Sequence, residues 1–322
     1  NEWTYNNNVG YVLPAGNYYL GTDLTLDHQI RISNSQEVKV TLCLNGKTIT
    51  CTENYDAVIQ TPTTYPVEFT LCDCRPSDSV GKITHANGIR GVGVELNNNN
   101  AVNAVAHKFI MYNGCITGNK TTNGAGVFLY SNTTFTMYGG SITGNSVSGS
   151  GGGVFVAAYD GTQGSFAMYG GSITGNRATG DGGGVCVDCG KFTMSASADG
   201  QNIPSITGNN ATENGGGMYV VGSSSTFEMT GGSITGNNAA YGGGVCVSKN
   251  GSFEMSGSSC ITNNKADSYG GGVHISYASA TFTMKGGSIT GNNAYKSDYI
   301  STFGGGVCVG NGTFTMTDGS IT

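Results

Sequence analysis

Two carboxylates occupy equivalent positions in consecutive sequence repeats. Glu228 and Glu254 are each the middle residue of a Phe-x-Met triplet, and acid–base catalysis or cation binding needs two such groups close together. Most other repeats hold Thr or Ala at this position, which is typical of an exposed, variable site. Lys249 and Lys285 could supply counter-charges. We therefore assign no catalytic residue and treat the pair only as a weak metal-site candidate.

Three tyrosines share another position, directly after the Met of consecutive repeats. Tyr112, Tyr138 and Tyr169 would face outward if Phe and Met face the core, because side chains alternate along a strand. Sugars stack on such flat rings, and partner proteins bury them. The alternative is that the rings only stabilise each other and shield a strand. We take these tyrosines as the first ligand-binding candidates.

A second outward position is apolar. The middle residues of successive Val-x-Val segments include Phe128, Phe155 and Tyr219, which are further ligand-binding candidates. The later members of this column are Cys186, Cys246, His274 and Cys308. Apolar side chains on an outer face are normally covered. We expect a loop to cover them, with a partner or a ligand as the alternatives.

The chain has 10 cysteines but no spacing typical of a zinc site. Cys43 and Cys72 align with the tyrosine position on what look like adjacent coils, so we expect a disulfide between them. Cys186 and Cys246 fall two coils apart, roughly 9.6 Å, which is too far for a bond. The Cys72-x-Cys74 pair is weak evidence for a metal or redox site. Most cysteines are expected to be unpaired, and no cofactor is expected.

The element that positions all of these residues is a repeat. Units resembling Phe-x-Met-x-Gly-Gly-Ser-Ile-Thr-Gly-Asn recur eight times from Phe109 to Thr322, and a Gly-Gly-Gly-Val-x-Val segment usually follows. A period of about 30 residues that varies in its loops is the signature of a solenoid. Each unit holds three short alternating apolar segments bounded by turn residues, which predicts strands. The expected fold is an all-β, single-stranded, right-handed parallel β-helix of three short strands per coil and about 11 coils.

The repeat also suggests how the chain is divided. Residues 1–37 do not fit it, and we interpret them as an N-terminal cap and an irregular first coil. The β-helix is expected over residues 38–322, with irregular coils over 38–108 and regular repeats over 109–322. Because Thr322 falls inside a repeat, we expect the helix to continue, or its last coil to contact a flanking domain or another chain end to end.

Composition excludes several classes of function. Only 11% of residues are charged and the net charge is −6, without clusters of Lys or Arg, which argues against nucleic acid and against anionic membranes. No stretch of 18 apolar residues is present, so we expect no membrane insertion. The 55 glycines lie mostly in the repeated turns, so they indicate tight corners rather than disorder.

Two polar columns run along the repeats. The Asn of Ile-Thr-Gly-Asn can hydrogen-bond along the stack and satisfy the turn, so it is expected to be structural. The Ser and Thr of Ser-Ile-Thr form a two-column hydroxyl strip, an arrangement that some ice-binding proteins use to order water. The strip is narrow, and Ser lacks the methyl group of Thr, so ice binding is the most remote alternative.

These residues resemble two groups of repeat proteins. The segment Ile234–Val245 is similar to repeats of chlamydial polymorphic membrane proteins, although Ile stands for Phe and Val for Ile. The order Tyr19–Leu26, Thr41–Ile49 and Thr70–Cys74, followed by the regular units, looks like large cell-surface proteins of gut Firmicutes. This second resemblance implies a secreted or wall-attached, adhesin-like β-helix, and it supplies no catalytic residues.

We therefore expect a non-enzymatic, extracellular adhesin or binding stalk of a bacterial surface protein. Its partner would be a glycan or protein on a host or bacterial surface. The main alternative is a carbohydrate-active enzyme, either a polysaccharide lyase or a glycoside hydrolase. Such enzymes keep clustered acidic and basic residues in one groove, whereas the regular coils here carry few charges.

Overall fold

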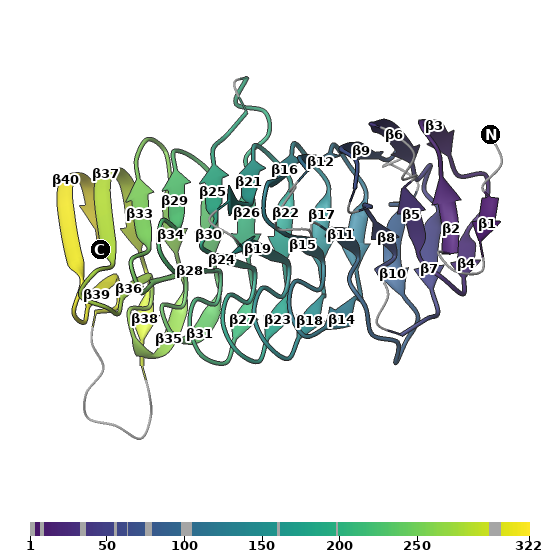
Figure 1. Cartoon of the computed structure of the whole chain (residues 1–322). Helices are drawn as coiled ribbons and strands as arrows, with labels where there is room; N and C mark the ends of the chain where they lie inside the picture. Colours follow the sequence, from purple (N-terminus) through teal and green to yellow (C-terminus); the bar gives the residue numbers. More distant parts are fainter. Residues whose placement is uncertain are drawn as a thin grey trace.

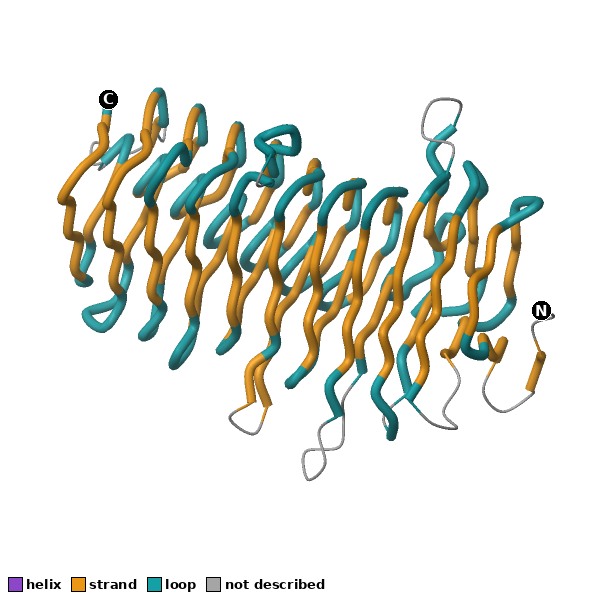
Figure 2. Tube along the Cα trace, turned by 90° about the horizontal axis from the view of Figure 1, so that it is seen from above, coloured by secondary structure: helices purple, strands orange, loops and turns teal. Residues whose placement is uncertain are grey.

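The chain is a parallel β-helix in a computed structural model, with coils that stack along one axis from the N-terminal to the C-terminal region (Figure 1). The structure describes residues 4–6, 10–32, 37–54, 57–62, 64–74, 79–97, 105–159, 162–197, 199–295 and 304–322. These residues form strands and turns and no helix, and the view from above shows the strands crossing the axis side by side (Figure 2). The all-β parallel solenoid predicted from the repeat is confirmed.

One wall of the coil is built from the Val-x-Val segments and is called the valine sheet here. Each strand pairs in parallel with its equivalent in the next coil, because valines at alternate positions face a common core. Its strands are β2 (Gly10–Leu13), β5 (Ile30–Ile32), β8 (Ile59–Gln60), β11 (Val94–Leu96), β15 (Val127–Leu129), β19 (Val154–Tyr159), β24 (Val185–Asp188), β28 (Met218–Val221), β32 (Val245–Val247), β36 (Val273–Ile275) and β39 (Val307–Val309). Two antiparallel strands, β1 (Thr4–Asn6) on β2 and β20 (Thr162–Gln163) on β19, extend it.

The Phe-x-Met and Ser-Ile-Thr segments together form a 20-stranded sheet. The phenylalanine strands are β3 (Gly16–Tyr19), β6 (Val38–Cys43), β9 (Val67–Cys72), β12 (His107–Met111), β16 (Thr133–Met137), β21 (Ser165–Met168), β25 (Lys191–Met194), β29 (Thr226–Met229), β33 (Ser252–Met255), β37 (Thr281–Thr290) and β40 (Thr313–Ile321). The isoleucine strands are β4 (Leu24–Leu26), β7 (Thr48–Cys51), β10 (Lys82–His85), β13 (Cys115–Thr117), β17 (Ser141–Thr143), β22 (Ser172–Thr174), β26 (Ser205–Thr207), β30 (Ser233–Thr235) and β34 (Cys260–Thr262). In β37 and β40 the two segments run on as one strand.

A further sheet lies at the corner after each Asn and was not predicted. Its seven short strands are β14 (Lys120–Thr121), β18 (Ser146–Val147), β23 (Arg177–Ala178), β27 (Asn210–Ala211), β31 (Asn238–Tyr241), β35 (Lys265–Tyr269) and β38 (Asn293–Ala294). Most have only two residues, too few to show an alternating pattern. Regular coils therefore carry a fourth short strand beyond the expected three.

The number of turns is slightly below the 11 expected. About nine full turns lie between Val38 and Val309. A turn formed by β3, β4 and β5 precedes them, inside the segment interpreted as an N-terminal cap and an irregular first coil, and β40 pairs with β37 beyond them. The right-handed sense of the coil stays a prediction.

The core is a set of continuous columns of identical side chains. Successive phenylalanine rings stack with centroids 4.6 Å apart at Phe109–Phe135 and Phe135–Phe166, and these rings are almost fully buried. Met and Ile columns fill the space beside them, so each coil buries the same face against its neighbours. This repetition fixes the register, since a one-residue slip would turn every apolar side chain outward.

The Asn column is a directional hydrogen-bond ladder. Asn145 shows the pattern: its Nδ2 donates to Oδ1 of Asn176 at 3.0 Å and to the carbonyl of Ile116 at 3.0 Å. Its backbone N–H donates to the same Oδ1. The pattern repeats in the same direction from Asn119 to Asn292. The structural role predicted for these asparagines is confirmed.

The ladder begins at a histidine. Asn119 has no asparagine before it in the column, and its Oδ1 instead lies 2.8 Å from Nδ1 of buried His85. The imidazole thus supplies the donor that an asparagine supplies in later coils. His85 marks where the irregular coils join the regular ones.

Removing one asparagine from the middle of the ladder tests its energetic role. Asn176→Ala leaves both donors of Asn145 without their acceptor and frees the carbonyl of Ile142. Each orphaned buried group costs about 1–3 kcal/mol, so we expect a loss of unfolding free energy of about 3 kcal/mol or more. Urea denaturation followed by circular dichroism measures it. The control is Asn87→Ala at an exposed turn, and equal effects at the two sites would contradict the ladder's role.

A second test concerns pH. His107 is fully buried, and burial lowers the pKa of its imidazole from 6.5 to about 4. Because the unfolded chain binds the proton more readily, stability is full above pH 6.5 and falls as the pH drops towards 4.

We expect this histidine to cost about 2 kcal/mol between pH 7 and pH 5. The difference should be absent in His107→Leu, which cannot titrate. The measurement is urea denaturation of both proteins at the two pH values. An unchanged pH dependence in the variant would assign the effect to other groups.

Candidate functional site

The tyrosine ladder, Tyr112, Tyr138 and Tyr169, is a stack of rings on the outer face of the coil. The centroids of Tyr112 and Tyr138 lie 5.2 Å apart at 12°, and those of Tyr138 and Tyr169 lie 5.5 Å apart at 21°. Tyr112 is 54% exposed and Tyr138 is 41% exposed. The column predicted from the repeat therefore forms an aromatic surface that is open to solvent at Tyr112 and Tyr138 and half-buried at Tyr169.

A glycine directly follows Tyr138 and Tyr169, whereas Asn113 follows Tyr112. In Tyr138-Gly139-Gly140 the last glycine has φ +82°, and a Cβ there would lie 2.7 Å from the carbonyl oxygen of Gly114. Such a conformation and such a close approach both favour glycine. The chain can thus turn tightly after Tyr138. Beside Tyr169 a neighbouring loop comes close, because a Cβ on Gly170 would lie 2.8 Å from Cβ of Asn202.

The same column extends towards the N-terminal coils. Tyr19, which is 75% exposed, pairs in register with Cys43, and Cys43 pairs with Cys72. Tyr112 follows on the next coil, where its N–H donates to the carbonyl of Leu71. Aromatic rings therefore flank the cysteines along one outer face.

The other aromatic candidates are buried. Phe128, Phe155 and Tyr219 are 7–8% exposed and pack in a separate cluster with Cys186 and Cys246. The cover is the glycine turn that precedes each valine strand. The expected loop cover is thereby observed, and the tyrosine ladder remains the accessible part of the predicted site.

These covering turns depend on glycine. A Cβ on Gly151 would lie 2.8 Å from Cβ of Phe155, and one on Gly182 would lie 2.8 Å from Cβ of Cys186. Both glycines have positive φ, +72° and +61°. A side chain at either position would push the turn away from the apolar column.

The two predicted carboxylates lie side by side on an outer face. Glu228 and Glu254 are direct partners on β29 and β33, in a groove of about 510 Å³ that Lys191 also lines. Glu254 binds Lys285 through a 2.8 Å contact between Oε2 and Nζ. Glycosidases hold two carboxyl groups on opposite sides of a scissile bond, whereas these two point from one face.

The prediction of a disulfide between Cys43 and Cys72 is wrong. The two residues are direct neighbours in register, as predicted, but Cys43 is bonded to Cys74 with a Cα separation of 6.3 Å. The cause is the turn after β9, where the carboxylate of Asp73 accepts hydrogen bonds from the N–H groups of Gly46 and Gly81. This turn brings Cys74 back towards Cys43, whereas Cys72 keeps a free thiol.

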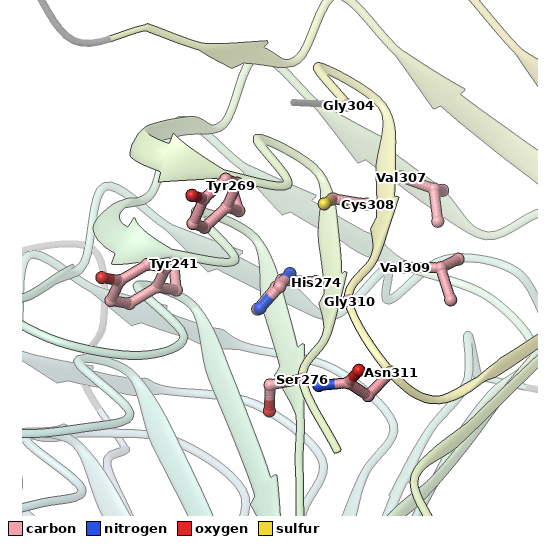
Figure 3. A pocket seen from close by; sticks show the side chains of 10 residues that line it. All are labelled: Tyr241, Tyr269, His274, Ser276, Gly304, Val307, Cys308, Val309, Gly310 and Asn311. Carbon is pink, nitrogen blue, oxygen red and sulfur yellow. The ribbon is translucent and has the colours of Figure 1, made fainter. Parts of the chain in front are cut away.

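A pocket of about 530 Å³ near the last coils was missed by sequence reasoning (Figure 3). The rings of Tyr241 and Tyr269 stack at 5.7 Å, and each centroid lies 5.9 Å from that of His274. Cys308 lies on the next valine strand beside His274. A signal was present in the sequence, because both tyrosines directly precede Gly-Gly-Gly in consecutive units.

The pocket is suited to an uncharged, flat group. Burial lowers the pKa of His274, against a backbone hydrogen bond with Cys308, so the imidazole stays neutral at pH 7. Burial also raises the pKa of the Cys308 thiol. The walls therefore offer aromatic and neutral polar surface.

In comparisons with known proteins, no protein-family model, no curated protein and no solved structure matches the chain. Among the described residues, no helix has the length and apolar character needed to cross a membrane.

Chemical labelling tests which tyrosines are accessible. Nitration should modify Tyr112 and Tyr138, which are exposed, and spare Tyr219, whose pKa is raised by burial. Peptide mass spectrometry locates the nitro groups. Nitration of Tyr219 in the folded protein at a rate equal to that of Tyr138 would show that the glycine turns do not cover it.

Proposed function

We propose that this chain is a non-enzymatic binding module of an extracellular bacterial surface protein, and that the tyrosine ladder is its contact surface. The observation that carries the proposal is the nearly parallel stack of Tyr112, Tyr138 and Tyr169, in which the first two rings are exposed and the third is half-buried. Exposed aromatic patches on a protein surface often mark sites that bind a partner. Flat rings suit sugars as well as protein partners.

The ladder's position on the solenoid supports recognition of an extended ligand. Strand spacing places one ring about every 4.8 Å along the axis, so a chain-like ligand laid along the axis would meet successive rings. We favour a surface glycan over a protein, because neutral rings with hydroxyl groups match the faces and edges of sugars.

The location outside the cell is part of the proposal. It is supported by the resemblance to bacterial surface proteins and by the Cys43–Cys74 disulfide, since such bonds persist mainly outside the cytosol. Contact of the last coil with a flanking domain or another chain stays a prediction.

A carbohydrate-active enzyme is the competing function. The groove with Glu228, Glu254 and Lys191 is the feature that favours it. Against it, the Lys285 contact neutralises Glu254, and both carboxylates extend from the same face. Ice binding by the Ser and Thr strip ranks lower, because the strip is narrow and Ser lacks the methyl group of Thr.

A glycan array probed with the wild-type chain and with Tyr138→Ala tests the proposal. Tyr138 is the central ring, so its loss breaks both stacking contacts. We expect binding to fall about tenfold, which corresponds to the energy of an aromatic contact. Tyr138→Phe keeps the ring and should retain most of the affinity.

The matched control is Tyr277→Ala, which removes a tyrosine that is 50% exposed but lies outside the ladder. It should leave binding unchanged. The proposal fails if no glycan binds, or if Tyr138→Ala and Tyr277→Ala behave alike. Turnover of a bound glycan that disappears in Glu228→Gln would instead support the enzyme.

A further inference from the structure

Three cysteine sulfurs meet next to the tyrosine ladder. The Sγ atoms of Cys43, Cys72 and Cys74 all lie within 4.8 Å of one another, and in the described part of the chain they are the one group of three potential metal ligands found so close together. Two of them form the disulfide, and the third, Cys72, is a free thiol. The Cys43–Cys74 bond does not use this third sulfur.

The distances suit a tetrahedral soft cation. Thiolates bound to Zn²⁺ at about 2.3 Å lie about 3.8 Å from each other. Once the bond between Cys43 and Cys74 is broken, the three sulfurs need to shift by less than about 2 Å to reach that arrangement. Sulfur ligands select Zn²⁺ and similar soft ions over Mg²⁺ and Ca²⁺.

The scaffold holds the three residues in place without the disulfide. Strand pairing sets Cys43 opposite Cys72 in consecutive coils. The carboxylate of Asp73 fixes the following turn through hydrogen bonds of 2.7 Å from Gly46 and 2.6 Å from Gly81. Supporting contacts of this kind orient metal ligands in known sites.

We propose that the reduced form of this three-cysteine cluster is a binding site for one Zn²⁺ or a similar soft divalent cation. Cys43 is buried and Cys74 is exposed, so the fourth coordination position faces solvent and is open to water or an external ligand. The site lies one coil from Tyr112, on the proposed contact face, but it does not depend on glycan binding.

Oxidation and reduction switch the site. A dithiol donor supplies two electrons and two protons, the Cys43–Cys74 bond breaks to give two thiols, and the donor becomes a disulfide. Zn²⁺ then displaces the protons of the thiols that it binds.

The test uses the full chain, reduced anaerobically with a phosphine, which cleaves a disulfide with water to give two thiols and the phosphine oxide. Zn²⁺ is titrated and the metal per chain is measured after desalting, and Co²⁺ reports thiolate ligation by its absorption. We expect one ion per reduced chain and none when the disulfide is intact.

Two variants separate this site from the other thiols. Cys72→Ser keeps the Cys43 and Cys74 pair and should weaken Zn²⁺ binding at least tenfold. Cys260→Ser restores the residue that most repeats carry at that position and should change nothing. Failure of the reduced wild type to retain an ion, or equal binding by Cys72→Ser, would overturn the proposal and leave the cluster as a disulfide beside an unused thiol.

Discussion

The whole structure depends on the register between neighbouring coils. Every column, whether Phe, Ile, Asn or Tyr, exists only because equivalent residues face each other across successive strands. Inside the coil the register is set by apolar packing, and at the corner it is set by amide hydrogen bonds that no other register would satisfy. The same register also aligns the outward-facing residues, so a surface residue that is repeated in successive coils forms a continuous stripe.

Because the register also aligns the outer residues, the outer columns could be predicted from the sequence. The tyrosines after the Met of three consecutive repeats were expected to form a stack, and Tyr112, Tyr138 and Tyr169 do so, because their placement follows from two-residue alternation alone. The parallel coil and the asparagine ladder were predictable for the same reason. A structural feature that recurs in every coil can be recognised from the sequence, because the same residue appears at the same position of each repeat.

Features that occur once could not be found in this way. The disulfide partner of Cys43 was missed because it depends on the single turn at Asp73, which the repeat does not contain. The corner strands were missed because two residues show no pattern. The pair Tyr241 and Tyr269 was present in the sequence, but it becomes a pocket only together with His274 from the valine sheet.

The polarity of the asparagine ladder has an evolutionary consequence. Each amide gives hydrogen to the coil ahead and receives it from the coil behind, so a duplicated unit can be spliced between any two coils while every amide still finds both neighbours. A partial duplication would leave a gap in the chain of donors. Unequal recombination between whole units is therefore a tolerated route by which such a rod changes length. The asparagine ladder itself begins at His85.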